Sequence, residues 1–183
     1  MNNMFLERRF EPPVGHAEVI QMALDSIGCF GIHRVKWHGS FLANDGGRMF
    51  CWLSAPDMES ARIALRQVGT DIRVLWQGDV FDGPGFGEND IAVANVIVER
   101  SFDESVTLQQ IQDIEDAGIG CLQTRNVRFV RTFFSADRKR MICLYEAPDA
   151  ESVRQSQREA GVPFHDAWAF RRVSLADIEN LTS

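Results

Sequence analysis

The sequence has no uninterrupted run of about 18 apolar residues, the minimum length of a membrane-spanning helix. Its first residues, MNNMFLERRFEPP, carry charges where a secretory signal peptide would need an apolar segment. Positive charge is in the minority, because 19 Lys and Arg stand against 26 Asp and Glu, for a formal net charge of −7. An acidic surface repels phosphate backbones. We therefore expect a cytoplasmic protein that binds neither nucleic acid nor membranes.

Cysteine is also sparse, and no two of the four cysteines have the CxxC spacing of a zinc or redox motif. In a cytoplasmic protein we expect all four to be reduced. Cys51 and Cys143 lie between apolar neighbours, so we expect them to pack as small apolar side chains. The chain also lacks a GxSxG sequence and a glycine-rich loop between a strand and a helix. No motif for nucleophilic catalysis or phosphate binding is therefore present.

The chain contains a long internal repeat. The stretch RMFCWLSAPDMESAR, residues 48–62, returns as RMICLYEAPDAESVR, residues 140–154. A shift of 92 positions aligns residues 5–76 with residues 97–168 without a gap, and 22 of the 72 pairs are identical. Solenoid repeats have periods of roughly 20–50 residues, so a period this long indicates a duplicated domain.

The segment between the two copies has the composition of a linker. It reads DGPGFGEND, with four of nine residues Gly or Pro. We therefore expect a first repeat at 1–81, a linker at 82–90, a second repeat at 91–175 and a C-terminal tail at 176–183.

Both copies predict the same order of elements. Short runs rich in apolar and β-favouring residues predict strands, and apolar residues at helical spacing predict two helices. The first helix of each copy should end at a glycine, Gly28 or Gly120. The second helix of the first copy should have Pro56 and Asp57 in its first turn and should end at Gly69. The resulting order, βαββαβ, is that of a ferredoxin-like unit.

The middle strands of each copy should form a hairpin. NDGG at residues 44–47 predicts a tight turn, and ADRK at residues 136–139 predicts a different turn type in the second copy. A βαββαβ unit places both helices on one face of an antiparallel sheet and leaves the other face bare, and a bare apolar face must be covered. We therefore expect an α+β fold in which two ferredoxin-like units pack sheet to sheet as a pseudo-dimeric α/β barrel.

The second copy is similar to a known family. Glu-Arg-x-Phe on the first strand, CLYEAPDAESVR after the hairpin and REAGVP before the last strand resemble a small family of unknown function. That family belongs to the dimeric α/β-barrel group of ferredoxin-like proteins, and one branch is described as nickel-binding. Its members are usually single domains that pair, so the resemblance implies a fold of two paired units. The first copy departs from it, with Leu53-Ser54 in place of Tyr145-Glu146.

Histidine usage weighs against a metal site. The family's usual second helix carries a histidine at the position that aligns with Ser156, and with Ala64 in the first copy, and both copies lack it. None of the four histidines is duplicated by the shift of 92, so we predict no inherited pair of metal sites. A single asymmetric site that uses His38, Glu7 or His165 stays open, because imidazole and carboxylate suit nickel or zinc.

Duplicated acidic and aromatic residues are the first candidates for ligand binding. Glu7 and Glu99 interrupt apolar strands, where a carboxylate is costly unless it is paired or exposed. Trp76 and Trp168 occupy matching positions on the last strands, and each offers a flat apolar surface with one N–H donor. If these four residues face one space between the sheets, they could hold a small organic ligand. The structural alternatives are that each glutamate pairs with a nearby arginine, such as Arg131 or Arg48, or lies at a solvated strand end, and that each tryptophan fills the core.

Residues that occur in one copy only are the second group of candidates. His38, Tyr145, Glu146 and His165 have no equivalent in the other copy, as an active site confined to one half would require. They are candidates for ligand binding and for a cofactor-free enzyme of the monooxygenase or isomerase type, in which two of them should lie within hydrogen-bond reach. The sequence identifies no cofactor and no ligand. It also allows a homodimer, since sheet edges would be available for pairing.

Overall fold

The computed structural model describes residues 1–182, apart from the side chains of Glu88, Glu115, Leu181 and Thr182. Ser183, the last residue of the predicted tail, lies outside the described residues. The chain forms two compact units: unit 1 comprises residues 1–78 and 171–182, and unit 2 comprises residues 79–170. Within the described residues there are eight strands, and no helix is both long and apolar enough to cross a membrane.

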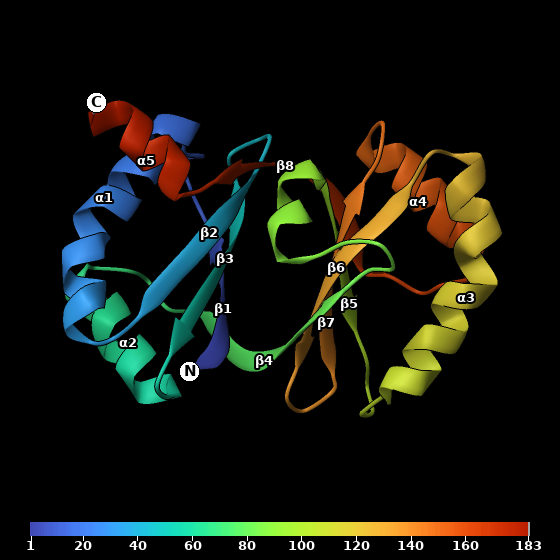
Figure 1. The fold of residues 1–183 in the computed structure, drawn as a ribbon, viewed down its shortest axis with the longest axis horizontal. Coiled ribbons are helices and arrows are strands. Elements are labelled where there is room, and N and C mark those ends of the chain that lie inside the picture. Colours follow the sequence, from blue (N-terminus) through green and yellow to red (C-terminus); the bar gives the residue numbers. More distant parts are fainter. Residues whose placement is uncertain (183) are drawn as a thin grey trace. The chain divides into compact units, whose positions relative to one another are not determined.

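Unit 1 contains the elements of the first copy in the predicted order βαββαβ. They are β1 (Asn2–Arg9), α1 (His16–Ile32), β2 (Lys36–Ala43), β3 (Arg48–Ala55), α2 (Met58–Gln67) and the first part of β4 (Val74–Asp82). The strands are antiparallel and lie in the order β4-β1-β3-β2, with both helices on the same face (Figure 1). A C-terminal helix, α5 (Leu175–Thr182), packs against α1 in this unit.

Unit 2 repeats the same order. Its elements are a short 3-10 helix (Glu88–Val93), β5 (Val96–Ser101), α3 (Leu108–Thr124), β6 (Arg128–Ser135), β7 (Arg140–Glu146), α4 (Ala150–Glu159) and the first part of β8 (Asp166–Val173). The strands are again antiparallel, in the order β8-β5-β7-β6, and α3 and α4 lie on one face (Figure 1). The two copies of the sequence therefore adopt the same strand order.

Strand alternation gives the sheet of unit 1 two different faces. Met4 and Leu6 join the core between the sheet and its helices. Phe5 points to the opposite face, where its ring stacks on Phe50 with centroids 5.7 Å apart. Because side chains alternate along a strand, Glu7 shares the face of Phe5 and lies away from α1 and α2.

The first helix of each copy is longer than predicted. The expectation that Gly28 and Gly120 end these helices is wrong, because α1 and α3 each continue for four residues beyond the glycine. A glycine inside a helix costs only about 1 kcal/mol relative to alanine, so apolar packing on either side can extend the helix through it. The left-handed residues that follow the helices are Arg34, with φ 56°, and Asn126, with φ 54°.

The two hairpin turns are alike, so the prediction of a different turn in the second copy is wrong. Gly46 has φ 72° and its N–H donates to the carbonyl of Ala43 at 2.8 Å. Arg138 has φ 61° and its N–H donates to the carbonyl of Ser135 at 2.9 Å. The left-handed position is therefore retained although glycine has been replaced by arginine, whose guanidinium lies over the ring of Phe134 at 4.8 Å.

The second helices begin with the same cap. Asp57 is the N-cap of α2 and does not lie within its first turn as predicted; its carboxylate accepts from the backbone N–H of Ser60 at 2.7 Å. Asp149 caps α4 in the same way. Hydrogen bonds from Ser60 hold the pKa of the Asp57 carboxyl below its ordinary value. Gly69 and Gly161, which follow the helices, have φ of 72° and 67°, as expected for left-handed glycines that end a helix.

Candidate functional site

The duplicated glutamate and tryptophan of unit 1 are hydrogen-bonded to each other. Nε1 of Trp76 donates to Oε1 of Glu7 at 2.9 Å. The contact arises because β1 and β4 pair with Phe5 opposite Trp76, which places the indole beside the residue two positions along. The Trp76 ring also packs on Phe5, with centroids 4.4 Å apart. Glu7 and Trp76 are both half-buried.

Unit 2 contains the same pair. Nε1 of Trp168 donates to Oε1 of Glu99 at 2.6 Å, and Trp168 lies opposite Ile97 on the paired strands β8 and β5. The Trp168 side chain is 6% exposed, and Glu99 is half-buried. Each carboxylate thus has an indole N–H as one of its partners. Arg131, which the sequence suggested as an alternative partner, forms an ion pair with Asp82 at 2.5 Å.

His38 lies at an irregularity of strand β2. The pairing of β2 with β3 shifts register between Trp37 and Gly39, and β6 of unit 2 has the same shift at the equivalent position. The imidazole of His38 stacks on the indole of Trp52, with centroids 4.3 Å apart. Its Nε2 lies 2.9 Å from Oγ of Ser54. A bulge of this kind re-aims a side chain, and here it places an imidazole against an aromatic surface.

Three other predicted site residues lie in unit 2, in different surroundings. Tyr145 is 1% exposed. Glu146, the next residue, is half-buried and forms an ion pair with Arg128 on β6. The side chain of His165 is exposed, while its backbone N–H donates to the carbonyl of Glu99 at 2.7 Å. Tyr145 and Glu146 are adjacent on a strand, so their side chains point to opposite faces of the sheet.

Tyr145 belongs to a buried polar cluster that the sequence did not single out. Nη2 of Arg100 donates to the hydroxyl of Tyr145 at 3.2 Å and to Oε1 of Gln157 at 2.8 Å. Nη1 of Arg100 donates to the carbonyl of Pro163 at 2.8 Å, and Nε2 of Gln157 donates to the Tyr145 hydroxyl at 3.3 Å. Three neutral oxygens therefore satisfy a guanidinium that is 5% exposed. Glu99-Arg100 repeats Glu7-Arg8 of the first copy, and this repetition is the sequence pattern that could have indicated a role for Arg100.

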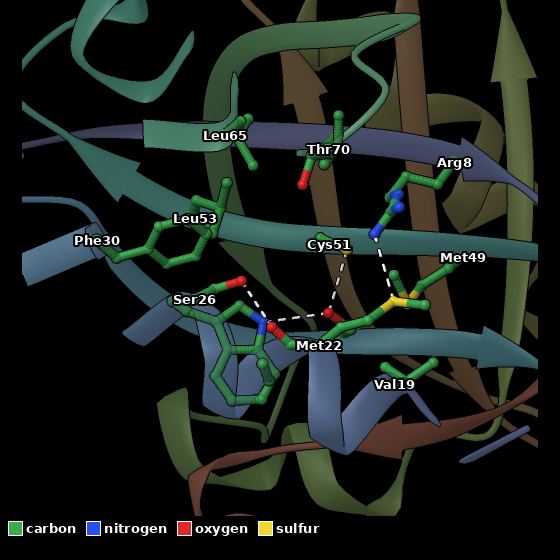
Figure 2. A pocket seen from close by; sticks show the side chains of 14 residues that line it. Arg8, Val19, Met22, Ser26, Phe30, Met49, Cys51, Leu53, Leu65 and Thr70 are labelled. Atoms are coloured by element: carbon green, nitrogen blue, oxygen red, sulfur yellow. Dashed lines mark hydrogen bonds between the residues drawn. The ribbon is translucent and has the colours of Figure 1, made fainter. Parts of the chain in front are cut away.

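Unit 1 has a cavity at the equivalent place, between its sheet and helices α1 and α2. Its volume is about 50 Å³, and Figure 2 shows the side chains that line it. Arg8 supplies the charge, and the other lining residues are apolar or carry a hydroxyl or thiol. Nη1 of Arg8 contacts Sδ of Met22 at 3.7 Å, and its guanidinium carbon lies 4.8 Å from the ring centroid of Phe10. None of the eight residues predicted for the site lines this cavity.

The buried cysteines pack as the sequence predicts. Cys51 and Cys143 are 5% and 0% exposed, and none of the four cysteines forms a disulfide within the described residues. A hydroxyl donates to each buried sulfur at 3.1 Å, from Ser40 to Cys51 and from Thr132 to Cys143. Burial raises the pKa of the Cys51 thiol to about 11, although Ser40 and the charge of Arg8 both act to lower it. The Cys51 sulfur is therefore a protonated, unreactive thiol near neutral pH.

Among the residues that the structure describes, no three His, Cys, Asp or Glu side chains gather closely enough to hold a metal ion. Within each unit, two of the predicted site residues come together as a Trp–Glu pair, Trp76 with Glu7 and Trp168 with Glu99.

Comparison with known families finds a match for the second copy. Residues 97–169 match the family model described as "Nickel responsive protein SCO4226-like", which confirms the resemblance inferred for this half. The match spans less than half of the chain. The solved structure of SCO4226 from Streptomyces coelicolor A3(2) is 22% identical, with a TM-score of 0.37, and covers 40% of this chain and 91% of that chain. No curated protein sequence matches the chain.

Solved structures show the fold of the whole chain. A mutant chlorite dismutase from Candidatus Nitrospira defluvii has a TM-score of 0.54 at 15% identity and covers 99% of this chain and 95% of that chain. Another mutant of that enzyme, in complex with cyanide, has a TM-score of 0.53 at 14% identity and covers 96% and 92%. At such identities the likeness concerns the fold alone. The chain thus has the mixed α/β fold, with antiparallel strands, of these structures.

Proposed function

We propose that this protein binds a small, planar organic molecule that carries a positive charge or several N–H donors. The observation that supports this function is the duplicated Trp–Glu hydrogen bond, Trp76 to Glu7 and Trp168 to Glu99. An indole face attracts flat and cationic groups, and a carboxylate accepts charge-assisted hydrogen bonds from them. The two residue types, held side by side, are complementary to such a ligand.

Partial exposure supports the same proposal. A carboxylate with a purely structural role in a core would be enclosed, whereas Glu7, Glu99 and Trp76 are each half-buried. The indole N–H fixes one carboxylate oxygen and so orients the other for a ligand. Trp76 packs on the buried rings of Phe5 and Phe50, so the accessible aromatic surface beside Glu7 is that of Trp76 itself. Such a surface, with one polar group at its edge, is typical of sites for small organic molecules.

The proposed arrangement of the chain follows the duplication. We propose that the repeats at 1–81 and 91–175, joined by the linker at 82–90, are ferredoxin-like units that pack sheet to sheet as a pseudo-dimeric barrel. The likeness to chlorite dismutase over nearly the whole chain supports this packing. The tail at 176–183, the cytoplasmic location and a homodimer stay predictions from the sequence.

Binding of a planar cation tests the function. Benzamidinium should quench the tryptophan fluorescence of the wild-type protein in a saturable way. The double variant Glu7→Gln/Glu99→Gln should bind at least about tenfold more weakly, because an amide cannot form the charged contact. Glu104→Gln removes the same charge from an exposed loop and should leave affinity unchanged. Equal affinity of the double variant and the wild type would contradict the proposal.

A nickel-binding role is the second candidate, because the matched family is described as nickel-responsive. His165 is the one histidine within the matched segment, and its backbone lies beside Glu99. This role predicts one tightly bound nickel ion per chain after dialysis against the metal, measured by elemental analysis. His165→Asn should lose that ion, whereas His33→Asn, outside the matched segment, should keep it. Two results would reject the role. One is that both variants retain the same amount of nickel, and the other is that neither the variants nor the wild type retains any.

A further inference from the structure

The cavity under α1 and α2 differs from its counterpart in unit 2 in the hydrogen-bond acceptors that surround its arginine. In unit 2 the guanidinium of Arg100 is satisfied by Tyr145, Gln157 and the Pro163 carbonyl. The shift of 92 places Leu53 and Leu65 of unit 1 at the positions of Tyr145 and Gln157. Unit 1 has therefore kept the arginine and lost both side-chain acceptors.

The unit that lacks these acceptors also has the larger cavity. The corresponding cavity of unit 2, lined by Arg100, Val162 and neighbouring apolar residues, has a volume of about 10 Å³. That of unit 1 is about 50 Å³. About 10–15 Å³ measured in this way accommodates one water, so the unit 1 cavity, at about 50 Å³, has room for about three to five non-hydrogen atoms.

Two hydrogen-bond donors in the unit 1 cavity have no strong acceptor. Within the described part of the chain, the acceptor of Arg8 is the sulfur of Met22 at 3.7 Å, and a thioether sulfur is a weak acceptor. Thr70, which replaces Val162 of unit 2, also lines the cavity, and none of the side-chain hydrogen bonds found among residues 1–182 uses its hydroxyl. Figure 2 shows Arg8 and Thr70 in the upper part of the view, with Cys51 below both.

The remaining hydroxyls are already engaged. Ser26 donates to the carbonyl of Met22 at 2.6 Å, and Ser40 donates to Cys51 at 3.1 Å. The rest of the wall is apolar, so a ligand with several charged oxygens would leave some of them without partners. A single carboxylate with a short alkyl tail matches one guanidinium, one hydroxyl and an apolar wall.

We propose that unit 1 binds a short monocarboxylate, of the size of acetate or propionate, with its carboxylate on Arg8 and Thr70 and its alkyl group among the apolar side chains. The ligand would supply the oxygen acceptors that Tyr145 and Gln157 supply in unit 2. This site is separate from the Trp–Glu pairs, so either one can fail without the other. A ligand of so few atoms should bind with a Kd of about 1 mM.

Titration with propionate, followed by amide chemical shifts of the full-length protein, tests the proposal. Saturable shifts should appear at β1 and α1, with a Kd at least about tenfold lower than that of propionamide, which has the same shape without the charge. Sodium chloride at the same ionic strength should not reproduce them. No saturable shift, or equal affinity for propionate and propionamide, would overturn the proposal without the need for any variant.

Two variants test the site, and the first of them uses unit 2 as the model for the residues that it introduces. Leu53→Tyr/Leu65→Gln installs the acceptors of unit 2 in unit 1, and should abolish propionate binding while the protein stays folded by circular dichroism. Arg8→Met should weaken binding at least about tenfold by removing the charged donor. Undiminished binding by either folded variant would show that the ligand lies elsewhere and would reject the site.

Discussion

Replacing Tyr145 by leucine should lower the free energy of unfolding by about 3–5 kcal/mol. The side chain is 1% exposed and packs against Phe129 with ring centroids 5.7 Å apart. Leucine leaves part of that space empty, and it removes the oxygen that accepts from Arg100 and Gln157. A buried guanidinium then loses one of its oxygen acceptors, and both effects destabilise the folded state. Urea unfolding followed by circular dichroism measures the change.

Tyr145→Phe separates the two effects. It keeps the ring and removes only the hydroxyl, so it should cost about 1–2 kcal/mol. The matched control in unit 1 is Leu53→Met, which conserves volume where no polar cluster exists and should cost less than about 1.5 kcal/mol. If Tyr145→Leu were no more destabilising than Leu53→Met, the buried cluster would not stabilise unit 2.

The free energy of unfolding should fall as pH rises from 9 to 11, by about 2 kcal/mol, through the ionisation of Cys51. Burial raises the pKa of this thiol from 9.0 to about 11. Because the folded state holds the proton more tightly than the unfolded state, the contribution is complete below pH 9. This contribution is lost as the pH rises toward the pKa of the thiol in the folded protein, because the thiol then ionises in the unfolded chain while it stays protonated in the folded one.

The difference between the wild type and Cys51→Ala isolates this effect. Below pH 9 the variant should be less stable by about 1 kcal/mol because of the small cavity. Toward pH 11 the two free energies of unfolding should converge and then cross. Cys29→Ala alters a half-buried thiol on α1 and should follow the wild type. A constant difference between wild type and Cys51→Ala over this range would contradict the burial of a protonated thiol.

The order of elements in each copy could be predicted from the sequence. Two copies of one pattern gave independent evidence for each strand and helix. Glu7 and Glu99 could be recognised as candidates because a carboxylate in an apolar strand is costly unless it is paired or exposed. That Trp76 and Trp168 are hydrogen-bonding partners of these glutamates depends on strand register, which alternation alone does not specify.

Other features depend on three-dimensional packing and could not be predicted. Gly28 and Gly120 were expected to end helices, yet tertiary packing continues α1 and α3 through them. Arg8 was not a candidate, because its role depends on the space left by Leu53 and Leu65, which are 12 residues apart in sequence and on different elements. The sequence signal for this difference between the units is that the first copy has leucine at the positions of Tyr145 and Gln157.

Native mass spectrometry of freshly purified protein tests the central claim, that the two Trp–Glu pairs bind a small organic ligand. The account predicts an additional organic mass on the wild-type protein and its absence from Glu7→Gln/Glu99→Gln, with elemental analysis of the same samples to identify any metal. The same additional mass on both proteins would contradict the claim. So would stoichiometric nickel on the wild type without any organic mass.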